Sequence, residues 1–174
     1  MEQDGDMKEE EHGKRGKAVR ESVSFILYLI VIVVLTFLMI RYVGQRTRVD
    51  GSSMENTLTN GDNLIVDKIS YRFHEPERFD IIVFPYQYKE DTYFIKRIIG
   101  MPGETVQITD KGEILINGEE LVESYGREVI KDPGLASDPI TLGEDEYFVM
   151  GDNRNYSKDS RFPDVGNIKR ADII

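Results

Sequence analysis

Serine and lysine side chains lie in two segments of this chain where their chemistry could be unusual. Ser52 and Ser53 belong to the turn-rich run Asp50-Gly-Ser-Ser-Met-Glu-Asn-Thr-Leu58, in which a serine ordinarily serves only as a turn or cap residue. Lys96 belongs to the apolar run Tyr93-Phe-Ile-Lys-Arg-Ile-Ile99. A lysine that loses its hydration has a lowered pKa, and its neutral amine can take the proton of a serine hydroxyl. The two segments could therefore support nucleophilic catalysis.

The position of the lysine within its run leaves two interpretations open. Side chains alternate between the faces of a strand, so Lys96 and Arg97 fall on opposite faces, each with apolar neighbours. At least one of these cations must then share a face with apolar side chains. It is either an edge-strand or snorkelling cation, which is the structural interpretation, or a desolvated base.

A third segment is almost entirely polar. Gly151-Asp-Asn-Arg-Asn-Tyr-Ser-Lys-Asp-Ser-Arg161 follows an apolar strand, and its composition alone predicts an exposed loop. Its charged and hydroxyl side chains could instead form a fixed hydrogen-bonded network that holds a site rigid. These side chains are Asp152, Arg154, Ser157, Asp159, Ser160 and Arg161.

The composition excludes several other kinds of site. With no cysteine, the chain cannot hold disulfides, thiolate zinc sites or iron–sulfur clusters, and it has no Cys nucleophile. Its two histidines, His12 and His74, are too few for a multi-histidine metal centre. We therefore expect no metal and no cofactor. A net charge of -10 also disfavours binding to nucleic acid, whose phosphates attract basic proteins.

An uncharged apolar stretch precedes these segments. The 18 residues from Val23 to Ile40 would form about 27 Å of helix, close to the roughly 30 Å hydrocarbon thickness of a bilayer. A buried core helix is usually amphipathic, and a cleaved signal peptide has a shorter apolar region and a small-residue cleavage site. We therefore predict a retained transmembrane anchor over 22–41.

Charge on either side of the anchor predicts its orientation. Five basic residues lie before the apolar run 23–40 and three lie just after it, which favours a cytoplasmic N-terminus in the cell membrane. They are Lys8, Lys14, Arg15, Lys17 and Arg20 before, and Arg41, Arg46 and Arg48 after. The predicted domains are a cytoplasmic tail at 1–21, the anchor, and an extracytoplasmic domain at 42–174.

The extracytoplasmic domain is predicted to be mainly β, with antiparallel sheets. β-Branched and aromatic runs of strand length are separated by turn residues. These runs are 63–67, 80–84, 93–99 and 146–150, together with a hairpin of 106–109 and 113–118 turned at Gly112. Residues 119–143 contain prolines and glycines without periodicity, so we expect a loop-rich excursion there.

Three of these segments resemble the type I signal peptidases, membrane-bound serine endopeptidases that cleave signal peptides from exported preproteins with a Ser–Lys dyad. Residues 51–58 resemble the nucleophile box of that family, 96–104 the general-base box, and 151–161 a third conserved box. The resemblance implies that Ser53 is the nucleophile and that Lys96, not Arg97, is the base. It implies that Ser157 orients Lys96. The implied oxyanion-hole and supporting residues are Gly51, Ser52, Asp152, Asp159 and Arg161.

The resemblance also implies the binding partners of the chain, and the chain departs from the pattern of the family at three points. Signal peptides would bind as extended strands beside the site, next to membrane lipid. The family commonly has Pro in place of Asn56, so the turn after Ser53 would be less rigid. Some members place a serine hydroxyl in the oxyanion hole where this chain has Gly51, which leaves backbone N–H groups, including that of Ser53. The family usually continues past Ile174 with a closing strand, so we expect a truncated chain.

Two other classes of protein stay open. A self-cleaving repressor would share the Ser–Lys chemistry, but it should carry a DNA-binding region where this chain has an anchor. A non-enzymatic, membrane-tethered β domain would not need Ser53, Lys96 and Ser157 together.

Overall fold

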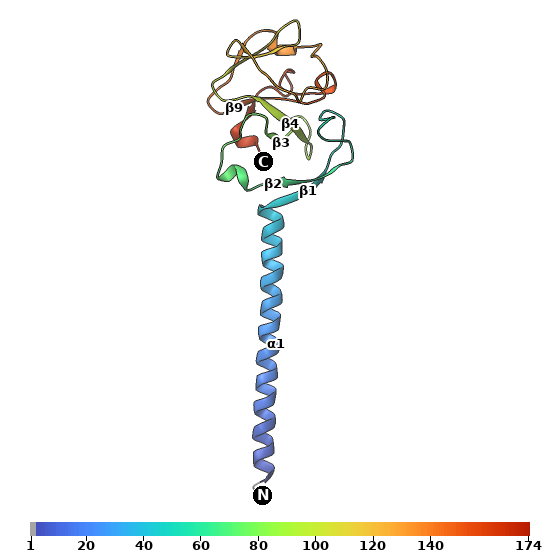
Figure 1. Cartoon of the computed structure of the whole chain (residues 1–174). Coiled ribbons are helices and arrows are strands. Elements are labelled where there is room, and N and C mark those ends of the chain that lie inside the picture. Colours follow the sequence, from blue (N-terminus) through green and yellow to red (C-terminus); the bar gives the residue numbers. More distant parts are fainter. Residues whose placement is uncertain (1–2) are drawn as a thin grey trace. The chain divides into compact units, whose positions relative to one another are not determined.

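The computed structural model describes residues 3–174, which fall into two units, one ending at Gly44 and the other running Gln45–Ile174. The first unit is built on one helix, α1 (Gln3–Tyr42) (Figure 1). Its segment Arg20–Tyr42 is long and apolar enough to cross a membrane, by length and composition. The helix contains the predicted anchor 22–41 and begins well before it. The preceding residues are rich in Glu, Lys and Arg, which favour helix without being apolar.

The second unit is built from ten short strands in three sheets among the residues described (Figure 1). They are β1 (Gly44–Arg48), β2 (Asn63–Asp67), β3 (Ile81–Pro85), β4 (Tyr93–Gly100), β5 (Thr105–Ile108), β6 (Ile114–Ile116), β7 (Glu119–Glu120), β8 (Ile140–Thr141), β9 (Glu146–Met150) and β10 (Ile168–Lys169). The described residues also form four 3-10 helices: Ser70–Arg72, Gly134–Ser137, Arg154–Tyr156 and, after β10, Arg170–Asp172. The predicted mainly β class is confirmed.

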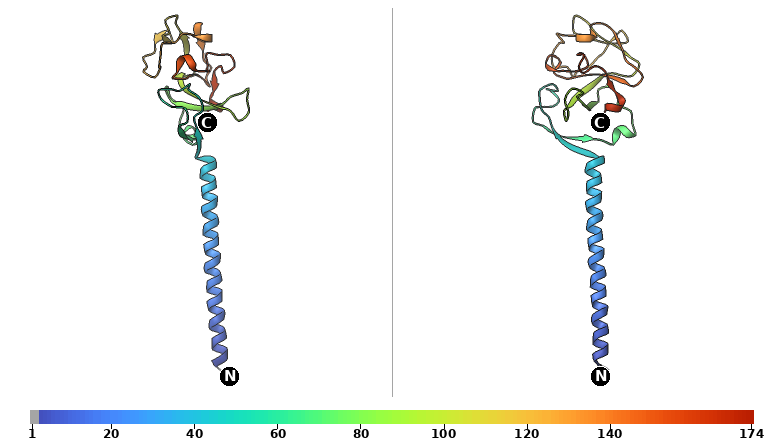
Figure 2. Two further views of the ribbon diagram at one scale, coloured as in Figure 1. Left: turned by 90° about the vertical axis from the view of Figure 1, so that its right-hand side faces the viewer. Right: turned by 180° about the vertical axis from the view of Figure 1, so that it is seen from behind.

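The sheets are β1-β2, β10-β9-β4-β3 and β7-β6-β5-β8, and both four-stranded sheets are antiparallel. β5 and β6 form the predicted hairpin, with Ile108 opposite Ile114. Within 119–143 the regular elements are only β7, the 3-10 helix Gly134–Ser137 and β8. In the three views of Figures 1 and 2, this excursion lies at the end of its unit opposite β1 and β2.

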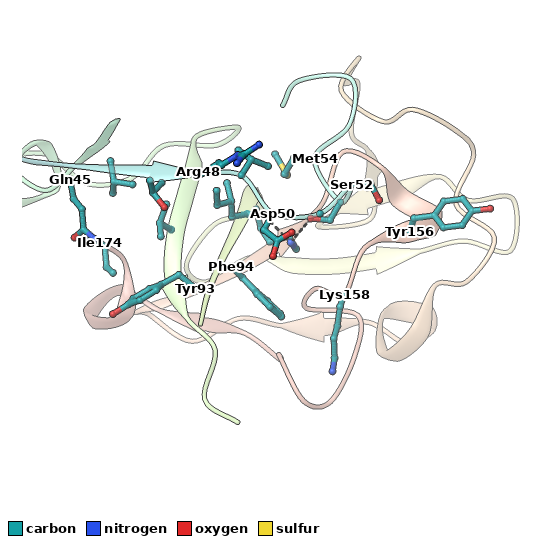
Figure 3. A pocket seen from close by; sticks show the side chains of 18 of the residues that line it. Gln45, Arg48, Asp50, Ser52, Met54, Tyr93, Phe94, Tyr156, Lys158 and Ile174 are labelled. Atoms are coloured by element: carbon teal, nitrogen blue, oxygen red, sulfur yellow. Dashed lines mark hydrogen bonds between the residues drawn. The ribbon is translucent and has the colours of Figure 1, made fainter. Parts of the chain in front are cut away.

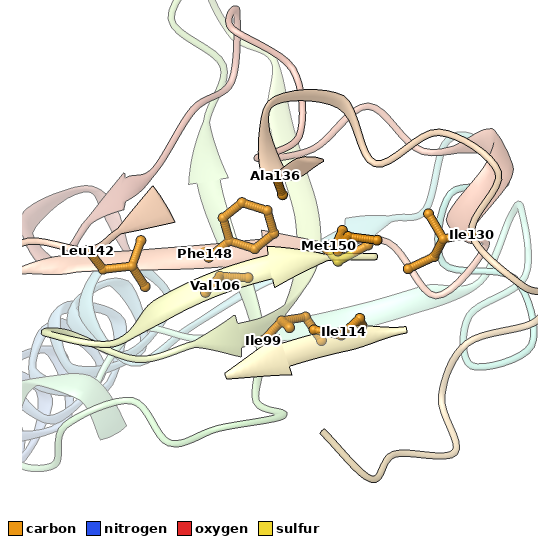
Figure 4. Close-up of a cluster of buried hydrophobic side chains, with 9 residues drawn as sticks. Ile99, Val106, Ile114, Ile130, Ala136, Leu142, Phe148 and Met150 are labelled. Carbon is orange, nitrogen blue, oxygen red and sulfur yellow. The ribbon is translucent and has the colours of Figure 1, made fainter. Parts of the chain in front are cut away.

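Two hydrophobic cores cover the two faces of the sheet that contains β4 and β9. Along β9, Phe148 and Met150 enter one core, while Tyr147 and Val149 enter the other. The first core also takes Ile99 from β4 and side chains from the hairpin and the excursion: Val106, Ile108, Ile114, Ile130, Ala136 and Leu142 (Figure 4). The second takes Ile82, Phe84, Ile98, Val165, Ile168 and Ile173. Both faces of β4 are therefore buried at its C-terminal half.

β4 is a central strand that is paired on both sides over only part of its length. β3 pairs with it from Tyr93 to Arg97, but β9 pairs with it only from Arg97 to Gly100. The edge of Tyr93–Lys96 that faces away from β3 therefore has no strand partner within the described residues. An unpaired strand edge presents backbone N–H and C=O groups that an extended peptide can bind.

Candidate active site

Ser53 and Lys96 are in direct contact. Lys96 Nζ donates hydrogen bonds to Ser53 Oγ at 2.8 Å and to the backbone carbonyl of Ile95 at 2.9 Å. Lys96 is only 4% exposed, although it belongs to a strand whose edge is open nearby. The structure thus joins the two side chains that the sequence paired, across 43 positions of the chain.

Burial changes the acid–base chemistry of Lys96. Desolvation lowers the pKa of its amine from 10.5 to about 8, while the negative charges of Asp159 and Asp152 oppose that shift. A fraction of the amine is therefore neutral at neutral pH. In that state Nζ can accept the proton of the Ser53 hydroxyl instead of donating to its oxygen.

The turn that carries Ser53 has an unusual backbone. Gly51 has φ +109° and Asn56 has φ +85°, in the left-handed region that Gly and Asn tolerate. Proline cannot adopt the angle found at Asn56, because its ring fixes φ near -65°. The turn at Asn56 therefore has a backbone conformation that the proline common in the resembled family could not adopt. The buried side chain of Met54 and a hydrogen bond from Leu58 N to Met54 O at 2.8 Å hold this turn in place.

The structure of the same turn shows which backbone N–H groups could form the predicted oxyanion hole. The backbone N–H of Gly51 donates to Asn60 Oδ1 at 3.0 Å, so it is already occupied. The backbone N–H of Ser53 makes no hydrogen bond within residues 3–174. Of these two groups, only the Ser53 N–H is free to stabilise a developing oxyanion.

The segment 151–161 binds the backbone of the turn that carries Ser53. Asn153 N donates to Ser53 O at 3.0 Å, and Asn153 Nδ2 donates to Ser52 O at 3.1 Å. Gly151 packs so closely here that a Cβ at its position would overlap Ser53 O and Ser157 Oγ. The predicted residue Ser52 thus contributes a backbone carbonyl, while its side chain is exposed and lines the open side of the site.

Arg97 is buried beside Lys96, on the other face of β4. Its guanidinium forms two hydrogen bonds with Asp152, Nε to Oδ1 at 2.8 Å and Nη2 to Oδ2 at 2.7 Å. Thr57 Oγ1 donates to Asp152 Oδ2 at 2.5 Å, and the ring centroid of Tyr125 lies 3.7 Å from the guanidinium carbon. Sequence reasoning named Asp152 but missed Thr57 and Tyr125. Both cations are buried, so neither is the exposed edge-strand or snorkelling side chain of the structural interpretation, although β4 has an open edge at Lys96.

Asp159 and Arg161 form a second buried pair. Arg161 Nε and Nη2 donate to the Asp159 carboxylate at 2.8 and 2.9 Å, and Gly151 N donates to Asp159 Oδ2 at 3.1 Å. Arg161 also donates to the backbone carbonyls of Asp132 and Arg154. The segment is therefore a fixed network, as one interpretation of the sequence required, and the exposed-loop interpretation is wrong.

Ser157 does not make the contact that the resemblance implies. Its side chain is buried, but its Oγ has no hydrogen-bond partner within the described residues and does not bond to Lys96 Nζ. Ile95 O takes the place of Ser157 as the second acceptor of the lysine. The predicted orienting role of Ser157 is therefore not formed in this structure.

Ser53 and Lys96 open into a groove of about 410 Å³. The side chains and backbone of 45–54 line one wall and those of 93–96 line the other, and Tyr156 and Lys158 lie beyond the pair. Asp50 is the acidic residue among those that line it. Figure 3 shows Gln45 and Ile174 at one end and Tyr156 at the other, with Asp50 and Ser52 between them.

His74, the histidine whose side chain the structure describes, does not line this groove. His74 is exposed, and its ring Nδ1 lies 3.3 Å from the carbonyl of Ser70. His12 precedes the residues whose side chains the structure describes. Among the described residues, no group of three or more His, Asp or Glu side chains could hold a metal ion. The groove thus brings a serine hydroxyl next to a buried lysine amine.

The sequence is similar to one family of known proteins. Residues 21–174 match the family described as signal peptidase, peptidase S26. A signal peptidase I of Leptolyngbya laminosa is 43% identical over 140 residues, which make up 76% of this chain and 66% of that protein. A probable signal peptidase I-2 of Synechocystis sp. is 40% identical over 126 residues, or 70% of this chain and 56% of that protein. The match thus spans less than two thirds of either relative.

A solved structure is also similar. The crystal structure of a signal peptidase I from Enterococcus faecalis V583 aligns with a TM-score of 0.45 and 35% sequence identity. The alignment covers 57% of this chain and 94% of that one.

Proposed function

This chain belongs to the signal peptidase family, peptidase S26, and we propose that it is a serine endopeptidase that cleaves signal peptides from exported preproteins. In this proposal Ser53 is the nucleophile and Lys96 is the general base. The observation that carries it is the 2.8 Å contact between Lys96 Nζ and Ser53 Oγ, made by a lysine that is 4% exposed. A buried lysine with a lowered pKa is a group that can accept a hydroxyl proton.

The reaction is acyl transfer in two steps. Neutral Lys96 Nζ takes the proton of Ser53 Oγ as the oxygen attacks the scissile carbonyl carbon, and the backbone N–H of Ser53 donates to the oxyanion. The tetrahedral intermediate collapses, the C–N bond breaks, and Lys96 returns the proton to the leaving amine. Water then attacks the ester carbonyl, Lys96 takes a proton from it, and the acid is released with Ser53 Oγ protonated again.

The substrate binds as an extended strand along the groove. Two strand edges support this part of the proposal. Among the described residues, Tyr93–Lys96 has no partner on the side away from β3, and β1 pairs with β2 on one side alone. Residues of both strands line the groove that contains Ser53. Backbone hydrogen bonds to such edges bind a peptide with little regard to its sequence, so pockets along the groove select the side chains.

The buried ion pairs position these groups. Arg97–Asp152 and Thr57 connect the strand of the base, the turn of the nucleophile and the segment 151–161. Asp159–Arg161 fixes Gly151, against which the carbonyl of Ser53 packs. Asp152, Asp159 and Arg161 are thus positioning residues, which act on the reaction through Ser53 and Lys96.

The proposal includes attachment to a membrane. Arg20–Tyr42 supplies an apolar helix of sufficient length, and the basic residues that precede it favour a cytoplasmic N-terminus and an extracytoplasmic catalytic domain. Exposed apolar side chains of the second unit support contact with lipid: Ile65 is 80% exposed and Phe73 is 76% exposed.

Processing of a preprotein tests the function. The full chain in detergent is incubated with an exported preprotein, and the cut is mapped by mass spectrometry. We expect a single cut after a small residue at the end of the signal peptide. Ser53→Ala should abolish it, while Ser137→Ala, an exposed serine far along the chain, should not. If the preprotein stays intact, the chain is a non-enzymatic tethered domain and the proposal is wrong.

A further inference from the structure

The groove does not end at the proposed catalytic pair. Beyond Ser53 and Lys96 it is lined by Tyr156 and Lys158, which lie at the end opposite Gln45 (Figure 3). Tyr156 is 71% exposed, and its hydroxyl makes no hydrogen bond within the described part of the chain. A large aromatic side chain that packs against little of its own protein is free to pack against a ligand.

The backbone under this aromatic ring is rigid. Tyr156 ends the 3-10 helix Arg154–Tyr156, and its backbone N donates to Asn153 O at 2.9 Å. Arg154 is 2% exposed and pairs with Glu123 at 2.8 Å, while Asp159 is fully buried. The ring is therefore presented at a fixed place, and its two side-chain torsions are all that binding must order.

Lys158 adds a positively charged side chain to the lining of the same groove. Its side chain is half exposed and forms an ion pair with Asp164, and Nζ also donates to Tyr86 OH at 2.9 Å. An exposed ion pair contributes about 1 kcal/mol or less, so the ammonium can turn toward a second carboxylate at small cost. The side chain thus favours an acidic ligand group over a basic one.

The two arms of the groove differ in what they can hold. The arm toward Gln45 is lined by residues of β1 and of Tyr93–Lys96, whose strand edges suit an extended chain that must stay bound through the acyl-enzyme stage. The arm toward Tyr156 is lined by Tyr156 and Lys158, which belong to a stretch between β9 and β10 that holds no strand among the described residues. The acyl half of a substrate therefore fits the first arm, and the leaving amine half fits the second.

We propose that Tyr156 and Lys158 form a binding subsite for the first residues of the mature protein, which follow the cleaved bond. The subsite takes an aromatic or other apolar side chain on the Tyr156 ring and an acidic side chain on Lys158. It rests on the proposed function, because a leaving half exists only if the groove cleaves a peptide. It makes the residues after the cut a source of specificity in addition to those before it.

Paired peptides test this subsite with the full chain in detergent. Both peptides share the same residues before the cut; one carries a small fluorogenic amine after it, and the other carries three residues that include Phe and Glu. In the unmodified chain the extension should raise kcat/KM about fivefold to tenfold, the range expected of an aromatic contact. Tyr156→Ala should lose this gain and Tyr156→Phe should keep it. Tyr88→Ala, another exposed tyrosine that does not line the groove, is the matched control and should keep it too.

A change of charge tests Lys158. Replacing Glu by Lys in the extension should lower kcat/KM in the unmodified chain, and Lys158→Gln should remove that difference while the exposed control Lys111→Gln preserves it. Equal gains from the extension in Tyr156→Ala and the unmodified chain would overturn the subsite. If neither peptide is cleaved, or Ser53→Ala cleaves both, the proposed function falls and the subsite falls with it.

Discussion

Arg97 and Asp152 face each other through two parallel hydrogen bonds of 2.8 and 2.7 Å, and both side chains are buried. They lie 55 positions apart, one next to Lys96 and the other at the start of the segment that holds Ser53 O. Thr57, in the nucleophile turn, donates to the same carboxylate. This pair is the point where the three segments that resemble a peptidase are joined.

Loss of Asp152 should destabilise the second unit strongly. Asp152→Ala leaves the Arg97 guanidinium buried without a counter-charge, which costs on the order of 3–5 kcal/mol of unfolding free energy. Urea unfolding in detergent, followed by near-ultraviolet circular dichroism of the tyrosines, measures it. Arg127→Gln breaks the exposed pair with Glu55 and should cost about 1 kcal/mol or less. Similar losses in both variants would contradict a structural role of the buried pair.

The pH dependence of cleavage should follow Lys96. Burial lowers its pKa to about 8, so the neutral base becomes more abundant as pH rises. We expect kcat/KM to increase roughly tenfold per pH unit well below that pKa and to level off above it. Lys96→Arg should be inactive at every pH, because a guanidinium stays protonated. A rate that is flat from pH 6 to 9, or an active arginine variant, would exclude Lys96 as the base.

The same shift predicts how pH affects stability. Between about 8 and 10.5 the unfolded chain binds the proton that folded Lys96 has lost, so the contribution of this residue to the unfolding free energy grows as pH rises. Lys96→Met removes the titrating group. The stability difference between the unmodified chain and Lys96→Met should therefore shift in favour of the unmodified chain from pH 8 to pH 10, measured by urea unfolding. A shift in the opposite direction would mean that the pKa of Lys96 is raised.

Local patterns predicted the elements of this fold well. Six of the ten described strands were recognised from β-branched and aromatic runs, among them the hairpin turned at Gly112, whereas β1, β7, β8 and β10 were not predicted. The helix was predicted from 22 because only its apolar part was counted, whereas helix propensity extends it to Gln3. Alternation along β4 placed Lys96 and Arg97 on opposite faces. It could not show that both are buried, because the second face is covered by side chains from 106–142, which lie far along the chain.

The side-chain partners of the site were harder to predict. Asp152 was named as a supporting residue, but its partner Arg97 and the Thr57 hydroxyl follow only from how the turn and β4 meet in space. The backbone carbonyl of Ile95 binds Lys96 where Ser157 was expected, and backbone acceptors leave no signal in residue types. Thr57, four residues after Ser53, was part of the recognised nucleophile segment, but nothing in the sequence assigned it a hydrogen-bond partner.

Gly151→Ala should impair the site without a change of charge. A Cβ there would overlap Ser53 O and Ser157 Oγ, so the nucleophile turn or Ser157 must move. A displacement of about 1 Å lowers the rate roughly a hundredfold, so kcat should fall by about that factor. Gly143→Ala is the control, because its nearest neighbour is the flexible side chain of Glu146 at 3.3 Å. Full activity of Gly151→Ala would mean that this contact does not position Ser53.

Membrane attachment and orientation can be measured in cells. We expect the full chain to stay in the membrane pellet after alkaline carbonate extraction, because an apolar helix of this length does not leave the bilayer. Protease added from outside should digest the second unit and spare an epitope placed before Met1. Charge reversal of Lys14, Arg15 and Lys17 should weaken this orientation. Protection of the second unit from external protease would place it on the cytoplasmic side.

The acyl-enzyme itself tests the proposed pair most directly. The full chain is mixed with an activated ester of a peptide that ends in small residues, quenched in acid at short times, and mapped by mass spectrometry. We predict one adduct, on Ser53, and its rate of formation should rise with pH through about 8. The adduct should not form in Lys96→Met. His74→Ala, which alters a histidine outside the groove, should form the adduct normally. An adduct on another residue, or one that forms as fast in Lys96→Met as in the unmodified chain, would contradict the Ser53–Lys96 mechanism.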